Sequence, residues 1–117
     1  MAVGVFAGIP VEDYSTAVEW YERLLGSAPS FFPNDVEAVW ELAESRFVYI
    51  IEDHKRAGGA VLMIWVDDPV AEAAEIAERG LEPVALEQHD TVWKYVFHDA
   101  DGNEIGIGGN TDNSESE

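Results

Sequence analysis

Hydrophobic and polar positions follow the same order of patterns in two long stretches of the chain. The first stretch opens with small and large residues in alternation over 3–9, which predicts a strand. A helix is expected over 14–25 and a strand over 46–52, where β-branched and aromatic residues gather. Residues 36–42 also predict a strand, although their Glu and Ala residues suit a helix as well. Residues 27–35 contain prolines and predict a loop or a weak strand.

The helix expected over 14–25 has a start signal, an end signal and one apolar face. Asp13 precedes it as an N-cap, and Gly26 follows it at a position that often takes a left-handed conformation. Its apolar residues recur at helical spacing and predict a buried face. These residues are Tyr14, Ala17, Val18, Tyr21, Leu24 and Leu25.

The second stretch repeats this order about 55 residues later. A strand is expected over 60–66, and two more are expected over 83–87 and 91–97. The segment between the first two predicts a helix that starts with Asp68 as N-cap and Pro69 at its first position. We expect Gly80 to end this helix and its buried face to comprise Val70, Ala73, Ala74 and Ala77.

A tight turn is expected over 98–104, whose residues are His-Asp-Ala-Asp-Gly-Asn-Glu. Asp and Asn side chains bond their own backbone in such turns, and Gly102 takes positive φ without steric cost. The turn separates an apolar strand from a second short apolar run over 105–109, which predicts a hairpin. The last strand of the fold would therefore end near residue 109.

Length and composition predict one globular domain. The chain has 117 residues, of which 47% are hydrophobic, enough for a single core. We expect the domain to span 1–109, with modules at about 3–55 and 60–109. Residues 110–117 include no apolar member and predict a disordered acidic tail.

The net charge and the absence of cysteine limit the binding partners and the cellular location that we expect. A formal net charge of −18 would repel phosphate backbones and anionic lipid, so neither nucleic acid nor membrane is expected as a partner. A chain without cysteine and without a secretory signal pattern at its start predicts a cytoplasmic location.

Two motifs, one in each half, resemble those of the vicinal oxygen chelate superfamily, which includes glyoxalase I, bleomycin-resistance proteins and extradiol dioxygenases. Residues 11–13 (Val-Glu-Asp), followed by 17–26 (Ala-Val-Glu-Trp-Tyr-Glu-Arg-Leu-Leu-Gly), are similar to the family's opening pattern. Residues 99–103 (Asp-Ala-Asp-Gly-Asn) are similar to its later Asp-Pro-Asp-Gly-Asn, with Ala100 in place of proline. The resemblance covers about 3–109.

The resemblance implies an α+β fold with two βαβββ modules whose curved mixed sheets surround a cleft. It also implies a homodimer, in which the cleft lies within one chain or is shared between two. Metal-dependent members draw His, Gln or Glu ligands from four sheet positions. Counting from the motifs, these positions fall at Phe6, at about Val61, at Gly106 and near Tyr49 or Ile51. None of these residues is a normal metal ligand, so we expect no metal and no cofactor.

The three histidines do not supply a replacement set of ligands. His54 is expected in the connector between the modules, His89 in a turn and His98 beside the turn at 98–104. Metal-dependent glyoxalase or dioxygenase activity is therefore not expected from this chain.

Aromatic and apolar residues are the candidates for ligand contacts in the cleft. Strand alternation places Phe6, Met63 and Trp65 on the same face as the former ligand positions. Aromatic faces stack planar guests and attract cations, which predicts an aromatic or cationic small molecule. Four further residues are candidates for ligand contacts. The strand register at Tyr49 is not fixed by the pattern, and neither is the side of the sheet on which Trp40, Trp93 and Tyr95 lie.

One carboxylate is a candidate catalytic group. Glu104 lies two residues before Gly106 and is expected to point the same way. Burial among apolar groups would fit it for general acid or base chemistry. Three functions remain open: a metal-independent small-molecule binder, a metal-independent isomerase or epimerase, and an interaction module with a vestigial cleft.

Overall fold

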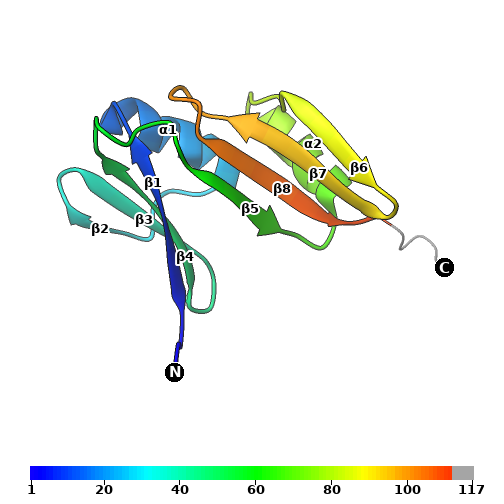
Figure 1. Cartoon of the computed structure of the whole chain (residues 1–117), viewed down its shortest axis with the longest axis horizontal. Helices are drawn as coiled ribbons and strands as arrows, with labels where there is room; N and C mark the ends of the chain where they lie inside the picture. Colours follow the sequence, from blue (N-terminus) through cyan, green and yellow to red (C-terminus); the bar gives the residue numbers. More distant parts are fainter. Residues whose placement is uncertain (112–117) are drawn as a thin grey trace.

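The computed structural model describes residues 1–111, and the chain forms two modules of equal architecture (Figure 1). Within the described residues, no helix is long and apolar enough to cross a membrane. The expected tail over 110–117 lies mostly outside the described residues. Its first two residues are ordered, because Asn110 ends the last strand and Thr111 donates its backbone N–H to Thr91 O at 2.7 Å.

The first module contains one helix and a four-stranded sheet. Its elements are β1 (Val5–Val11), α1 (Tyr14–Leu25), β2 (Phe31–Asn34), β3 (Glu37–Ala43) and β4 (Arg46–Glu52). The strand order is β1-β4-β3-β2, with β1 parallel to β4 and the other pairs antiparallel. The stretch over 27–35 thus contains a short strand.

The second module repeats this topology. Its elements are β5 (Val61–Trp65), α2 (Pro69–Glu78), β6 (Ala85–His89), β7 (Val92–His98) and β8 (Glu104–Asn110). The strand order is β5-β8-β7-β6, again with one parallel pair, β5 and β8. The α+β fold of two βαβββ modules is therefore confirmed.

Both helices begin as their N-cap residues predict. The Asp13 side chain accepts from the backbone N–H of Thr16, and that of Asp68 accepts from Ala71. Gly26 follows α1 with φ 79°, and Gly80 closes α2 with φ 96°, directly after the C-cap residue Arg79.

The buried face of α2 differs from the expected one. Val70 and Ala74 are exposed, and Pro69 and Ile76 are buried instead. The sheet-facing stripe runs through 69, 73 and 76, because the helix rests on β8 and β7 along that line. Because alanines occur on more than one face of this helix, the sequence pattern does not define clearly which face is buried.

Each helix covers one face of its sheet and leaves the other face open (Figure 1). Side chains alternate accordingly: on β1, Ile9 and Val11 are buried toward α1, whereas Phe6 lies on the opposite face. On β8, Ile105 and Ile107 are buried in the core that α2 covers.

The turn between β7 and β8 joins the two modules. The carboxamide of Asn103, which is fully buried, donates to Pro10 O at 2.8 Å and accepts from the backbone N–H of Ala60 at 2.9 Å. Asp101 accepts from the backbone N–H of Glu12 at 3.0 Å. One turn thus binds the end of β1, the start of α1 and the entry to β5.

Asp99 organises this turn from inside. One carboxylate oxygen accepts from the backbone N–H groups of Asp101 and Asn103, at 2.9 and 3.0 Å. The other accepts from the Tyr21 hydroxyl at 2.7 Å, which ties the turn to α1. Burial and the neighbouring Asp99 carboxylate raise the pKa of Tyr21, so its hydroxyl stays protonated and donates.

Replacing Tyr21 by Phe is expected to lower the free energy of unfolding by about 2 kcal/mol, because it removes a buried hydrogen bond to a carboxylate. Tyr14→Phe is the matched control on the same helix. Its hydroxyl donates to the neutral backbone oxygen of Glu37 at 3.2 Å in a half-buried site, so we expect a loss of about 1 kcal/mol or less. Urea unfolding measures both, and equal losses would contradict the role assigned to Asp99.

Candidate functional site

The open face of the second sheet carries a cavity of about 380 Å³, which we call the sheet-face cavity. Strands β5, β6, β7 and β8 all contribute to it. It is lined by Val61, Leu62, Met63, Glu87, His89, Val92, Lys94 and Glu104. Apolar walls with a few converging polar groups are typical of small-molecule sites.

Lys94 is the polar centre of this cavity. Its ammonium lies 3.3 Å from a carboxylate oxygen of Glu87 and 3.6 Å from one of Glu104. About a quarter of the Lys94 side chain is exposed, against 31% for Glu104. The three groups form one linked set of charges on neighbouring strands.

Glycines on β8 form the floor beneath these side chains. A Cβ atom at Gly106 would lie 2.8 Å from Lys94 Cδ, and one at Gly108 would lie 2.7 Å from Met63 Sδ. The stems of Lys94 and Met63 therefore lie across the backbone where other residues would place side chains. The absence of two side chains on β8 makes room for them.

The open face of the first sheet is aromatic. The rings of Phe6 and Phe47 stack with their centroids 4.1 Å apart. The Tyr49 ring lies across Gly8, where a Cβ would come within 2.7 Å of the phenol. Beside this ring is a small cavity of about 100 Å³, which Arg56 also lines.

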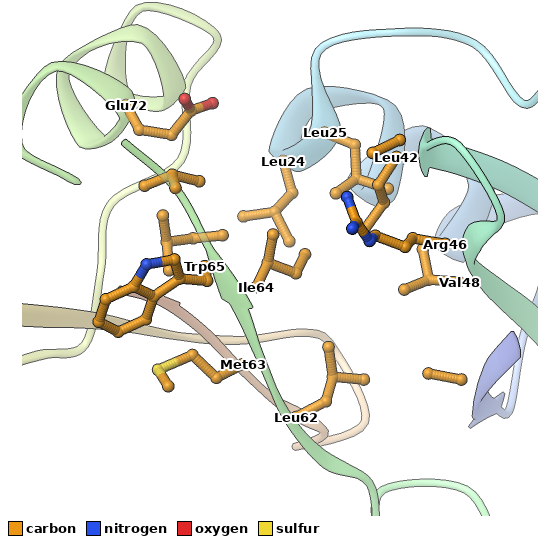
Figure 2. A pocket seen from close by; sticks show the side chains of 14 residues that line it. Leu24, Leu25, Leu42, Arg46, Val48, Leu62, Met63, Ile64, Trp65 and Glu72 are labelled. Atoms are coloured by element: carbon orange, nitrogen blue, oxygen red, sulfur yellow. The ribbon is translucent and has the colours of Figure 1, made fainter. Parts of the chain in front are cut away.

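A second large cavity, which we call the inter-module groove, lies between the two modules and has a volume of about 710 Å³. Figure 2 shows Leu24, Leu25 and Ile64 between Glu72 on one side and Arg46 on the other. Leu24 and Ile64 belong to the core or pack against it, so this groove is an opening between the two halves of the interior. It adjoins the sheet-face cavity, with which it shares Leu62 and Met63.

The structure separates the residues that alternation placed together. Met63 and Glu104 line the sheet-face cavity, and Met63 and Trp65 line the inter-module groove. Phe6 and Tyr49 lie on the open face of the other sheet and line neither of these two cavities. Glu104 does share the face of Gly106, since their partners on β5 are Val61 and Met63.

Trp40 belongs to the core and is removed from the candidate site. Its side chain is 1% exposed, and its indole N–H donates to Ser27 O at 2.9 Å. The ring packs near Tyr21 of α1, with the centroids 6.2 Å apart. On β4, Val48 is the cross-strand partner of Trp40, and the buried Ile50 lies on the same face. This face of β3 is therefore turned toward α1, which the sequence pattern did not establish.

Trp93 and Tyr95 also leave the candidate site, because they lie on the side of β7 that faces α2. Their partners across the sheet are Gly109 and Ile107, on the helix side of β8. Tyr95 packs against the core. These two aromatic residues are therefore separated from the sheet-face cavity by the sheet itself.

The sequence pattern missed Lys94 and Glu87. Lys94 stands between Trp93 and Tyr95 in the strand. Because neighbouring side chains alternate between the two faces and those two rings face α2, Lys94 lies on the open face. Glu87 is its direct partner on β6. The alternation was visible in the sequence, but nothing in it showed which side was open.

At three of the four sheet positions the side chains do not fit a metal ion. Phe6, Val61 and Gly106 offer no donor atom, and among the described residues no group of three or more His, Asp or Glu side chains is arranged to hold one. His54 instead pairs with Glu12 and, at 3.5 Å, with Glu52, and these carboxylates raise its pKa. His89 ends β6 and lines the sheet-face cavity.

Two βαβββ modules, each with one open sheet face, define the fold of the vicinal oxygen chelate superfamily. A glyoxalase/bleomycin resistance protein from Catenulispora acidiphila has the same fold, with a TM-score of 0.89 and 39% identity over 92% of this chain and 98% of that chain. The chain belongs to the glyoxalase/bleomycin resistance family.

Two more distant structures share the fold. A bleomycin-binding protein in complex with bleomycin has a TM-score of 0.74 and 15% identity, over 93% of this chain and 99% of that chain. A bleomycin resistance determinant encoded on transposon Tn5 has a TM-score of 0.73 and 16% identity, over 93% and 98%. No family model and no curated protein sequence matches the chain.

Alanine substitutions at two glycines of β8 distinguish its open face from its covered face. At Gly109 a methyl group would overlap Val66 O and lie 3.0 Å from Pro69 Cδ, so we expect a loss of about 3 kcal/mol in the free energy of unfolding. At Gly106 it would meet only flexible side chains, Lys94 and Met63, so we expect a change of less than about 1 kcal/mol. Urea unfolding measures both; a larger loss at Gly106 would show that this face has no room.

Proposed function

We propose that this protein is a metal-independent binder of a small planar molecule, and that the sheet-face cavity is its site. The observation that carries this proposal is a cavity of about 380 Å³ whose walls are mainly apolar and whose polar groups converge at Lys94. Such a cavity suits a guest with an aromatic ring and one polar group.

The residues at the family's metal positions support metal independence. Phe6 and Val61 carry hydrocarbon side chains, and Gly106 carries none. The space above Gly106 is taken by the stem of Lys94, so the residues around it favour a guest held by ring contacts and hydrogen bonds. These three side chains supply no donors for chemistry that requires a Lewis acid held by protein ligands.

The charge of the chain favours a neutral or cationic guest. A net charge of −18 disfavours the approach of anions. Around the cavity, Glu87 and Glu104 outnumber Lys94, so the local charge is also negative when His89 is neutral.

Binding of phenylnaphthylamine, a neutral dye that fluoresces in apolar sites, tests the proposal. Replacing Val92 by Trp in the cavity wall is expected to weaken binding at least tenfold, because an indole would fill much of the space. Val84→Trp is the matched control, since Val84 is 59% exposed and does not line this cavity. Fluorescence titration measures both variants against the parent chain.

Two results would contradict this function. One is absence of dye binding to the parent chain, which would favour an interaction module with a vestigial cleft. The other is stoichiometric zinc, nickel, manganese or iron in the purified protein, since a bound ion would require ligands outside the sheet positions considered above.

The isomerase or epimerase alternative depends on Glu104 as a base. Its place on the cavity wall keeps that possibility geometrically open. Its pairing with Lys94 at 3.6 Å favours a structural role, because a base surrounded by apolar groups would be more strongly activated.

A cytoplasmic location stays a prediction from the absence of cysteine.

We also propose that the chain forms a homodimer through its central strand edges. Strands β1 and β5 are edge strands of their sheets, and exposed edges tend to pair. Val5, Phe6, Val61 and Trp65 on these strands are each more than half exposed. The inter-module groove beside them carries Arg46 and Glu72 on opposite sides, an arrangement that a second copy in two-fold orientation could match.

Replacing Val5 by Asp is expected to shift the protein to a monomer, because a charge would be buried against the partner strand. Val84→Asp is the control, since Val84 is similarly exposed but precedes β6 at the far edge of the second sheet. Sedimentation equilibrium measures the mass of each variant. A monomeric parent chain, or equal dissociation of both variants, would exclude this interface.

A further inference from the structure

We propose that Lys94 determines which polar group the guest carries: its ammonium donates a hydrogen bond to a neutral acceptor oxygen, such as a ketone or amide carbonyl. The inference rests on the proposed function, since it concerns the same sheet-face cavity. It goes further by assigning the specificity to one side chain and by naming the chemical class that this side chain accepts.

The position of Lys94 in the sheet supports this role. It belongs to β7, an inner strand of the sheet that lies between β6 and β8 (Figure 1). Its stem crosses Gly106, where a Cβ would lie 3.0 Å from Lys94 Cγ. The glycine lets the stem lie against the backbone and directs the ammonium toward Glu87 and Glu104.

The contacts of the ammonium leave it able to donate to a guest. An ammonium has three N–H donors, and charge-assisted hydrogen bonds have donor–acceptor distances near 2.8 Å. The nearest oxygens of Glu87 and Glu104 lie 3.3 and 3.6 Å away, so these carboxylates attract the ammonium without holding it at the shortest distance. An acceptor atom in the cavity can therefore take one N–H while both ion pairs persist.

The same two carboxylates select against anions. An anionic group at Lys94 would also lie near Glu87 and Glu104, and its attraction to one cation would be offset by two like charges. A neutral carbonyl oxygen gains the hydrogen bond without that repulsion. The cavity therefore favours carbonyl compounds over carboxylates of the same shape.

No other Lys or Arg side chain on this sheet can replace Lys94. It is the only Lys or Arg in the four strands of the second module. The cation that follows α2 has another task, because Arg79 donates to backbone oxygens at the end of α1, including Leu24 O at 3.2 Å. Removing the Lys94 charge would therefore remove the cavity's cationic donor.

Prodan, a neutral naphthalene ketone whose emission shifts to longer wavelength when its carbonyl accepts a hydrogen bond, tests the inference. In Lys94→Met, which keeps the stem and removes the donors, we expect prodan to bind about tenfold more weakly and to emit at shorter wavelength. Lys94→Arg is expected to restore most of the red-shifted emission, because it keeps a cationic donor. Phenylnaphthylamine, which has no carbonyl, should lose less affinity than prodan in Lys94→Met, and its continued binding would show that the cavity is intact.

A second variant examines the role of the carboxylates. Glu104→Gln should increase the affinity for anilinonaphthalene sulfonate several-fold, because it removes one of the two charges that oppose the sulfonate. Prodan should respond little to this change.

The outcomes separate the two proposals. If phenylnaphthylamine binds but prodan binds the parent chain and Lys94→Met alike, the role of Lys94 is wrong and the binding function stands. Stronger binding of the sulfonate than of prodan to the parent chain would also overturn it, since Lys94 would then be an anion receptor. If none of the dyes binds the parent chain, both proposals fall.

Discussion

A buried hydrogen-bonded turn is the constraint on which the arrangement of the two modules depends. Asp99 gathers two backbone N–H groups and the Tyr21 hydroxyl, and Asn103 binds Pro10 and Ala60. A buried carboxylate and a buried carboxamide without partners would be costly, so the turn and its neighbours hold one another in place. Because these neighbours lie at the end of β1, on α1 and before β5, one turn fixes how the two halves meet.

The sidedness of each sheet follows from that arrangement. With α1 and α2 held over one face of the two sheets, the opposite faces remain open (Figure 1). Along each strand, side chains alternate between the covered and the open face. Trp40 therefore lies in the core, and Lys94 lines a cavity on the open face. The inter-module groove has a different origin, because it lies where the interiors of the two modules come together.

Glycine has an unusual part in the chemistry of the second sheet. At Gly106 and Gly108 the lack of a side chain lets Lys94 and Met63 lie flat across β8. In a sheet face of this size, two added side chains would occupy much of the volume available to a guest. The same absence removes the side chain from a position where the resemblance implies a metal ligand, and it makes the room that the stems of Lys94 and Met63 occupy.

The sequence by itself determined the elements, their duplicated order and the family, because caps, turn residues and periodicity are local and occur once in each half. Asp13 and Asp68 cap helices that begin next to them, and Asp99 accepts from the backbone N–H groups of Asp101 and Asn103 within its own turn. The sequence also showed that Phe6, Val61 and Gly106, at positions where the resemblance implies metal ligands, carry no side-chain donor atom. Only the tertiary structure decided which face of each strand is open, because alternation defines two faces without saying which one a helix covers. That is why the sequence left the faces of Trp40, Trp93 and Tyr95 open, and why the pairing of Lys94 with Glu87 and Glu104 emerged only from the strand register.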